Sequence, residues 1–347
     1  MKNASLREKD KAILNFIIEN YLKIGQPISS GFIAQKRQFF DSPATLRNVM
    51  AKLEELGFLY QPHTSAGRIP TDKGLRLYVK SLLNEILFPK GESNLLSEQF
   101  SLEKGDFNSL LLQVSKILAE YSDNLGFVLS PRISQINFRH LHFIKIGEDK
   151  VMIILITAFN LVLTEIVPTH NYFTQLELDR ASDYINQSFR GKNFVFIRNY
   201  LLQELPKFKL HYEDILNKLI ALLKASILQE EKESQIFLQG TSKLLDKAEL
   251  FDMERLKSLF QNFEEKAKLA KLLSDFISLD RVKILIGSES QWPEIEDCAL
   301  VLSNYGYDNQ VLGSLGIIGP KRLPYKKIIL LVDSVAKRLS QTISRHQ

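Results

Sequence analysis

Cysteine and long hydrophobic runs are what this sequence has least of. Its 347 residues include one cysteine, Cys298, which excludes an intrachain disulfide framework or a zinc site of several cysteines and favours a reducing compartment. Cys298 heads the apolar segment CALVLS, so we expect a small buried side chain. The most apolar stretch, VMIILITAFNLVLTEIV, is interrupted by Asn160 and predicts paired strands rather than a membrane span. The N-terminus, MKNASLREKDK, lacks the apolar core of a signal peptide, so we expect a cytoplasmic protein without a membrane partner.

Catalytic and metal-binding patterns are also scarce. None of the six histidines has the His-x-x-x-His spacing of a metal site. His140 and His142 alternate on one predicted strand and face the same side, which fits an exposed or hydrogen-bonded pair better than a metal site. The spacing of Gly313, Gly316 and Gly319 matches neither the dinucleotide-binding fingerprint nor the Walker A phosphate loop. We expect these glycines in tight turns between strands. We therefore predict no enzymatic activity, no cofactor and no metal.

The net charge of +5 is modest, but its placement is uneven. Residues 1–90 hold 14 Lys and Arg against 8 Asp and Glu, whereas the remaining residues hold 31 against 32. The first quarter of the chain therefore carries the whole positive excess, which favours a polyanionic partner. A basic face that serves only solubility is the alternative.

The first quarter of the chain predicts three short helices. LREKDKAILNFIIENYLKIG has apolar residues at helical spacing and is followed by helix-stopping residue Gly25. A second helix fits residues 30–38. Ser42 caps a third helix, Pro43 takes its first position, and an apolar face runs on to Gly57.

The last two of these helices form a helix-turn-helix pattern. In such a unit the first turn of the second helix enters the major groove of DNA. We expect Thr45, Arg47 and Asn48 to read base edges, because Arg pairs with guanine, Asn pairs with adenine and Thr packs on the thymine methyl. Ser42 and Lys52 are expected to contact phosphate.

A β-hairpin, the wing of a winged helix, is predicted directly afterwards by FLYQPHTSAGRIP. His63 and Thr64 are expected to contact phosphate there. Arg68, expected at the hairpin tip, would hold the wing against the phosphate backbone or in the minor groove. Each polar side chain taken alone fits plain solvation equally well, but their ordered combination indicates a DNA-reading surface.

Four segments carry a resemblance to a known family: GQPISS, SPATLRNVMAKLEELGFLYQPHTSAGRIPTDKGLRLYV, GTSKLL and LGSLGIIGPKRLPY. Together they resemble the HrcA family of bacterial heat-inducible transcription repressors. The resemblance is dense up to Tyr78 and again from Gly313 to Tyr325. It implies a negative regulator of chaperone operons of the groE and dnaK type. Such a protein binds an inverted-repeat operator as a homodimer and is kept active by the GroEL chaperonin.

The rest of the chain predicts two helices, a linker, many strands and a helical block. TDKGLRLYVKSLLNEIL predicts a connecting helix with Thr71 as its cap, and residues 88–94 fit a linker by their composition. An amphipathic helix fits residues 107–121, and a helical block spans about residues 176–276. LGFVLS, FRHLHFIKIG, KVMIILITA and LVLTEIVPT predict an antiparallel meander before that block. RVKILIGSES, CALVLSNYG, QVLGSLGIIGP and KIILLV predict further strands after it.

We therefore predict an α+β multidomain protein. It has a winged helix-turn-helix domain at 1–88 and a discontinuous GAF-like antiparallel-sheet domain at 95–171 and 239–347, which dimerises. A small, mostly helical inserted domain lies at 172–238; the GAF-like fold and the insertion are implied by the resemblance. Two alternatives remain: a ligand-sensing winged-helix regulator with a GAF-type sensor domain, and a winged helix used only for protein interaction.

Overall fold

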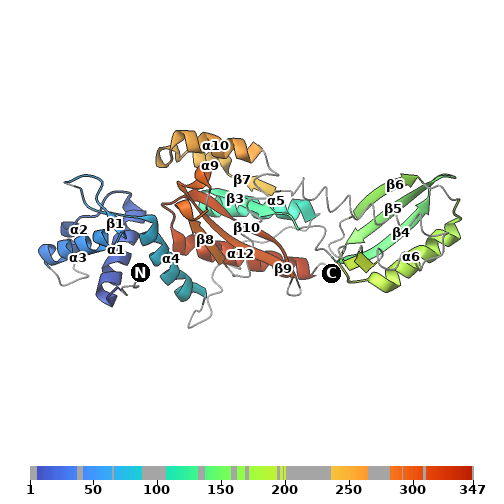
Figure 1. Cartoon of the computed structure of the whole chain (residues 1–347), viewed down its shortest axis with the longest axis horizontal. Helices are drawn as coiled ribbons and strands as arrows, with labels where there is room; N and C mark the ends of the chain where they lie inside the picture. The colour runs from blue at the N-terminus through green and yellow to red at the C-terminus, as the bar shows by residue number, and fades with distance from the viewer. Residues whose placement is uncertain are drawn as a thin grey trace.

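Three units lie in a row along the long axis of the molecule (Figure 1). The computed structural model describes residues 6–36, 42–64, 66–87, 107–131, 137–157, 162–168, 172–193, 196–197, 199–200, 236–264, 282–290, 292–307 and 310–345. None of the helices formed by these residues is both long and apolar enough to cross a membrane.

The N-terminal unit consists of three helices and a short hairpin. Its elements are α1 (Glu8–Ile24), α2 (Ser30–Gln35), α3 (Pro43–Glu55), β1 (Leu59–Tyr60) and β2 (Ile69–Pro70), with the two strands antiparallel. α1 ends at Gly25, whose φ of 77° is the left-handed conformation that favours glycine. These helices and strands confirm the elements predicted from the sequence. The expected end of the second helix, at residues 37–38, lies outside the described residues.

A fourth helix, α4 (Asp72–Leu87), leads from the N-terminal unit to the central unit. Thr71 caps it as expected, because its Oγ1 accepts a hydrogen bond from the Gly74 amide at 3.2 Å. The same hydroxyl donates to the Gly57 carbonyl at 2.7 Å, so the start of α4 is tied to the end of α3. The segment 88–94, expected as a linker, lies outside the described residues.

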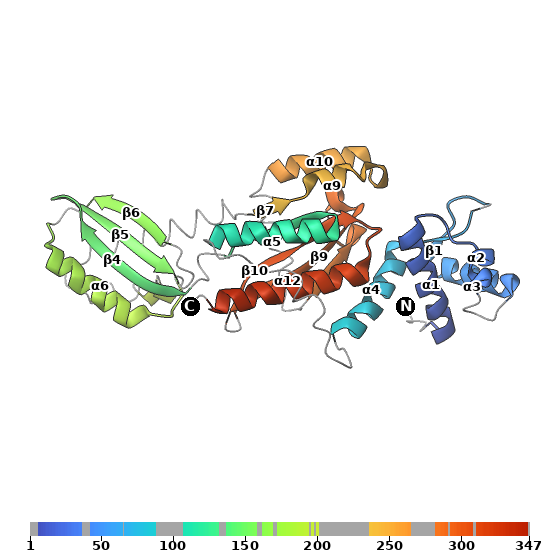
Figure 2. The same ribbon diagram turned by 180° about the vertical axis from the view of Figure 1, so that it is seen from behind.

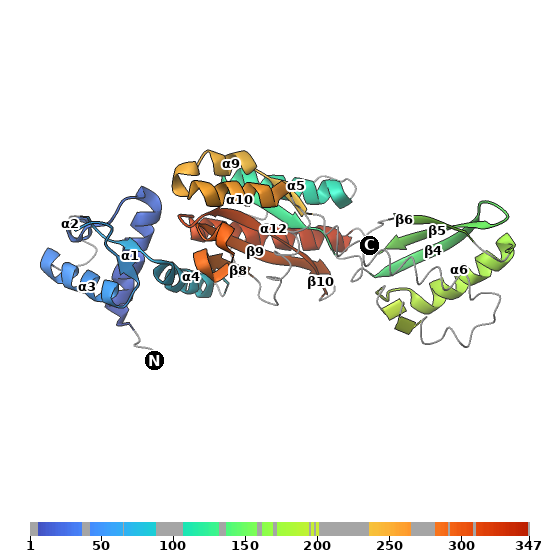
Figure 3. The same ribbon diagram turned by 45° about the horizontal axis from the view of Figure 1, so that its top comes forward.

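The central unit is built on a five-stranded antiparallel sheet with strand order β7-β3-β10-β9-β8. Its strands are β3 (Leu125–Leu129), β7 (Ile236–Gln239), β8 (Val282–Ile286), β9 (Cys298–Tyr307) and β10 (Gln310–Pro320). α5 (Phe107–Ser122) and α12 (Tyr325–Arg345) lie side by side on one face (Figure 2). α9 (Thr241–Leu245) and α10 (Met253–Glu264) cover the opposite face (Figure 3). Helices on both faces bury the sheet, which gives the unit two apolar layers.

Two elements of the central unit differ from the sequence-based expectation. KIILLV, expected as a strand, lies in α12, because its apolar residues continue at helical spacing to the end of the chain. The buried positions at this spacing include Ile328, Ile329, Val332, Val335, Ala336, Leu339 and Ile343. The helical block expected over residues 176–276 is interrupted by β7, which pairs with β3. Four residues are too few to show a strand period, so only the pairing identifies β7.

Three glycines expected in turns between strands lie inside β10 instead: Gly313, Gly316 and Gly319. A Cβ on Gly316 would lie 2.3 Å from the carbonyl oxygen of Val301, and one on Gly319 would lie 2.5 Å from Oδ1 of Asn124. The expectation of tight turns is therefore wrong. These glycines permit the close approach of neighbouring chain segments to β10.

A third unit, called the inserted unit below, covers residues 137–193. It contains a separate antiparallel sheet in the order β4-β5-β6, with β4 (Phe138–Lys145), β5 (Lys150–Thr157) and β6 (Val162–Pro168). This confirms the predicted meander for these three strands. The fourth segment expected in that meander forms β3, which pairs with β10 and β7 of the central sheet.

Helix α6 (Gln175–Phe189) packs on β4 and belongs to the inserted unit. Asn186 accepts a hydrogen bond from the amide of Leu141 at 2.8 Å and donates to its carbonyl at 2.9 Å. Ser182 Oγ accepts from the amide of Phe143 at 3.0 Å. The boundary expected at residue 172 therefore falls inside this unit, because these bonds join α6 to a strand that precedes the boundary.

Candidate nucleic-acid interface

The first turn of α3 is exposed and rigidly capped. Ser42 Oγ accepts a hydrogen bond from the amide of Thr45 at 3.2 Å and lies 3.0 Å from Thr45 Oγ1. Pro43 follows at the first helical position, where its missing N–H group costs no hydrogen bond. The side chains of Ser42 and Thr45 are both exposed. The expected position of both residues at an accessible helix start is therefore confirmed.

Arg47 and Asn48 project from α3 into solvent. Leu46, Met50 and Leu53 recur at helical spacing and are buried against the rest of the N-terminal unit. The two polar residues therefore point away from the core, and both are exposed. Within the described residues neither side chain has a hydrogen bond or an ion pair. This leaves a guanidinium and a carboxamide available to an external partner.

Lys52, one turn further along α3, forms an ion pair with another residue of the N-terminal unit. Its Nζ donates to Oδ2 of Asp10 at 2.6 Å. The Asp10 side chain, in the first turn of α1, is only 7% exposed, whereas the Lys52 side chain is 46% exposed. A buried carboxylate needs such a partner. This ion pair therefore fixes α3 on α1, a role that sequence reasoning missed because 42 positions separate the two residues.

The exposed end of the hairpin presents His63 and Thr64, both solvent-accessible as expected. Gln61 stabilises this turn: its Nε2 donates to the carbonyl oxygens of Thr64 and Ala66, each at 2.9 Å. The amide of Ala66 also donates to the His63 carbonyl at 2.8 Å. Gln61 was not among the predicted site residues. It positions the tip through main-chain contacts and leaves the His63 and Thr64 side chains accessible.

Arg68 lies at the base of the hairpin, so the expectation that it occupies the tip is wrong. The Arg68 amide donates to the Ile28 carbonyl at 2.9 Å, and the Ile28 amide donates to the Arg68 carbonyl at 3.0 Å. These two bonds form an antiparallel bridge beside β2. Its Nε donates to Oε2 of Glu54 in α3 at 2.8 Å, and the Arg68 side chain is 13% exposed. The residue therefore joins the hairpin to the end of α3.

Comparison with known proteins identifies the family. The family described as "HrcA protein C terminal domain" matches residues 108–329. The heat-inducible transcription repressor HrcA of Geobacter sulfurreducens is 36% identical over 338 residues, covering 97% of this chain and 98% of that relative. The chain belongs to the HrcA family.

A second relative agrees with this membership, and a solved structure shares the fold. The heat-inducible transcription repressor HrcA of Xylella fastidiosa strain M12 is 36% identical to this HrcA-family chain over 339 residues, covering 98% of the chain and 96% of the relative. A solved structure described as that of a hypothetical protein has a TM-score of 0.66 at 24% identity, covering 99% of this chain and 100% of that one. The latter likeness concerns the fold alone.

Two other features of this HrcA-family chain that the sequence singled out are a histidine pair and Cys298. His140 and His142 are exposed, and their rings stack with centroids 6.4 Å apart, which confirms that they share one side of β4. The described residues contain no group of three or more His, Cys, Asp and Glu side chains that could hold a metal ion. Cys298 is 2% exposed as expected, and burial raises the pKa of its thiol to about 12.

Proposed function

We propose that this chain represses heat-inducible transcription by binding double-stranded operator DNA through its N-terminal unit, which acts as a winged helix-turn-helix. The observation that carries the proposal is the exposed N-terminal half of α3, where Arg47 and Asn48 have no partner among the described residues and lie opposite the buried Leu46, Met50 and Leu53. That arrangement suits a helix whose tip enters the major groove. The positive excess of residues 1–90 supports the same partner.

In this proposal Thr45, Arg47 and Asn48 contact the base edges. Arg47 suits a guanine edge, Asn48 an adenine edge, and the Thr45 methyl group a thymine methyl. Ser42 supports this reading turn as its cap and lies near phosphate at the start of α3, where the helix dipole favours an anion. The capping bond at 3.2 Å keeps the turn in one conformation before DNA arrives.

The remaining predicted DNA contacts divide into two kinds. His63 and Thr64 extend from the hairpin tip and contact phosphate. Lys52 and Arg68 support DNA binding indirectly, because each forms an ion pair within the protein. Lys52 pairs with Asp10 at 2.6 Å, and Arg68 pairs with Glu54 at 2.8 Å. They hold α3 and the hairpin in the geometry that the DNA requires.

A homodimer matches an inverted repeat because each protomer presents one α3 to one half-site. The central unit, as a GAF-like domain, holds the two protomers together. Relief of repression on heating and dependence on the GroEL chaperonin follow from the family resemblance. Operator binding measured with and without the chaperonin at fixed salt tests this dependence.

Arg47→Ala tests base reading directly. We expect a loss of about 1–3 kcal/mol on operator DNA and a much smaller loss on random DNA at the same salt concentration. Lys23→Ala is a charge-matched control, since Lys23 is exposed in the last turn of α1 and away from the reading turn. Equal losses of Arg47→Ala on both DNAs would identify Arg47 as a phosphate contact and refute the assignment.

A further inference from the structure

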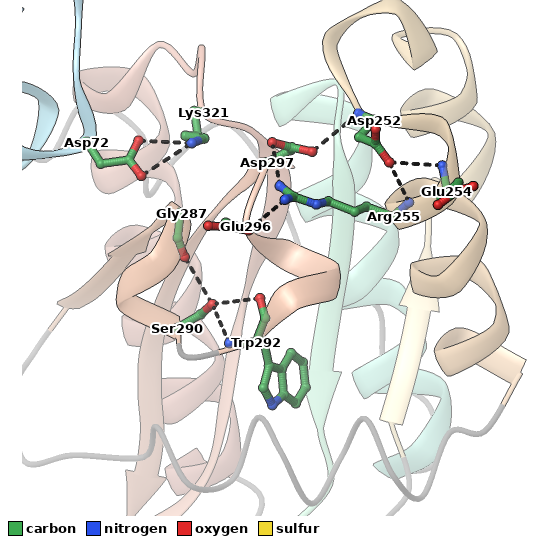
Figure 4. Close-up of polar contacts among 10 residues, drawn as sticks. All are labelled: Asp72, Asp252, Glu254, Arg255, Gly287, Ser290, Trp292, Glu296, Asp297 and Lys321. Carbon is green, nitrogen blue, oxygen red and sulfur yellow. Dashed lines mark hydrogen bonds and ion pairs between the residues drawn. The ribbon is translucent and has the colours of Figure 1, made fainter.

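Two partly buried ion pairs join α4 to the central unit, besides the exposed pair of Glu85 and Lys326. Arg76 of α4 donates to Glu289 through Nε at 2.6 Å and also through Nη2. The same Nη2 donates to the carbonyl of Ile284, in the middle of β8, at 2.6 Å. Nearer the start of α4, Asp72 accepts from Lys321 Nζ at 3.0 and 3.3 Å (Figure 4). Two ion pairs therefore join one helix to two loops of the central unit.

The central-unit partners of α4 also form hydrogen bonds within the central unit. Glu289 Oε2 also accepts from the amide of Ile286 at 2.9 Å. The amide of Lys321 donates to the carbonyl of Asp297 at 3.2 Å. Asp297 in turn pairs with Arg255 of α10 at 3.3 Å (Figure 4). Hydrogen bonds within the central unit therefore restrain the Glu289 side chain and the backbone of Lys321.

The N-terminal unit touches the same loop at a second point. A Cβ on Gly25, at the end of α1, would lie 1.9 Å from Nη1 of Arg322, so the guanidinium packs directly on the backbone there. A Cβ on Gly287 would lie 2.1 Å from Oδ2 of Asp72. The side chains of Arg322 and Asp72 therefore lie directly against the backbone across the junction at these two points.

Apolar contact also joins the units, but it does not fix their direction. Leu75 and Val79 of α4 and Ile328 and Val332 of α12 belong to one continuous core. Hydrophobic burial depends on area rather than orientation, whereas a two-donor Arg–carboxylate contact requires one geometry. The charged contacts therefore define the angle at which α4 leaves the central unit.

We propose that Arg76 and Asp72 of α4, with Glu289 and Lys321 of the central unit, are positioning residues for operator recognition. They fix the direction in which each α3 projects from the central unit, and they thereby set the half-site spacing that a dimer accepts. The proposal rests on the proposed function, because spacing has meaning only for a dimer that reads two half-sites. None of the four residues contacts DNA.

Operator spacing provides the first readout. Wild-type protein, Glu289→Gln and Glu85→Gln are titrated at fixed salt with operators whose half-sites are moved apart or together by one and two base pairs, and with one isolated half-site. Glu289→Gln keeps the side-chain shape but removes the charge. Glu85→Gln is the matched control, since Glu85 forms an ion pair with Lys326 across the same junction, but the two side chains are 65% and 59% exposed.

For Glu289→Gln we expect the preference for the best spacing over its neighbours to fall about tenfold, because one charge-assisted contact no longer defines the angle. Affinity for the isolated half-site should not change. Arg76→Lys, which keeps the charge and loses the second donor, should fall between wild type and Glu289→Gln. Glu85→Gln should behave as wild type. A variant that was only less stable would lose affinity equally at every spacing.

A distance measurement provides the second readout and needs no DNA. Spin labels on Lys23→Cys in α1 and Lys257→Cys in α10 report the separation of the two units, because both positions are exposed and buried Cys298 does not take up the label. Doubly labelled protein is diluted with unlabelled protein so that labelled protomers rarely meet. We expect a narrow distance distribution for wild type and Glu85→Gln, and a broad one for Glu289→Gln.

The outcomes separate the two proposals. An unchanged spacing preference in Glu289→Gln, an equal loss at all spacings, or an unchanged distance distribution would each overturn the positioning role in a protein that binds its operator. The wild-type protein alone tests the proposed function. If the wild-type protein bound no operator at any spacing while its distance distribution stayed narrow, the proposed DNA-binding function would be refuted. The spacing role would then be refuted as well, because it depends on operator binding.

Discussion

Lys52→Met separates a phosphate contact from a structural ion pair. Methionine keeps most of the aliphatic stem and removes the ammonium group that donates to Asp10 at 2.6 Å. The Asp10 carboxylate, 7% exposed, would then be left without its cation. Removing one partner of a fully buried ion pair costs about 3–5 kcal/mol. Because the Lys52 end is 46% exposed, water can partly replace it, and we expect a cost of about 1–2 kcal/mol.

Hydrogen exchange of the α1 and α3 amides measures this cost locally, since a chain with several units has no single free energy of unfolding. The amides of α10 in the same molecules serve as an internal reference. Lys11→Met is the matched control: Lys11 pairs with Glu8, and the two side chains are 40% and 89% exposed. We expect a change of at most about 0.5 kcal/mol for this control.

The salt dependence of operator binding completes the test of Lys52→Met. If Lys52 binds Asp10 rather than phosphate, the slope of log affinity against log salt should change by much less than about one unit. The reasoning would be refuted by unchanged hydrogen exchange in α1 and α3 together with a slope shallower by about one.

Three further outcomes are expected. Arg68→Ala and Glu54→Ala should each weaken binding to operator and random DNA alike in a gel-shift titration, and the double variant should lose no more than either alone, because both break one pair. Gly67→Ala should destabilise the hairpin by about 1–3 kcal/mol in hydrogen exchange, since its Cβ would lie 2.4 Å from backbone atoms, whereas Gly31→Ala, with its nearest neighbour at 3.8 Å, should not. Cys298, with its pKa raised to about 12 by burial, should not react with a thiol reagent at about pH 8 until the protein is unfolded.

The DNA-reading turn was predictable because its determinants are local. The Ser42 cap, Pro43 and the spacing of Leu46, Met50 and Leu53 all lie within one helix, and they fix both its start and its buried face. The outward direction of Arg47 and Asn48 follows from that face alone. The same logic gave the helix stop at Gly25 and the cap at Thr71.

The sequence alone determined the caps, the periodicity and the uneven charge, since each depends on neighbouring residues. The tertiary structure decided which distant segments meet: Lys52 with Asp10, Arg68 with Glu54, and Arg76 with Glu289. In the tertiary structure KIILLV lies in α12, and the predicted strands belong to two sheets, the five-stranded sheet of the central unit and the three-stranded sheet of the inserted unit. The physical reason is that pairing across tens of residues depends on which buried surfaces and backbone partners come together on folding, and no local spacing rule encodes that choice.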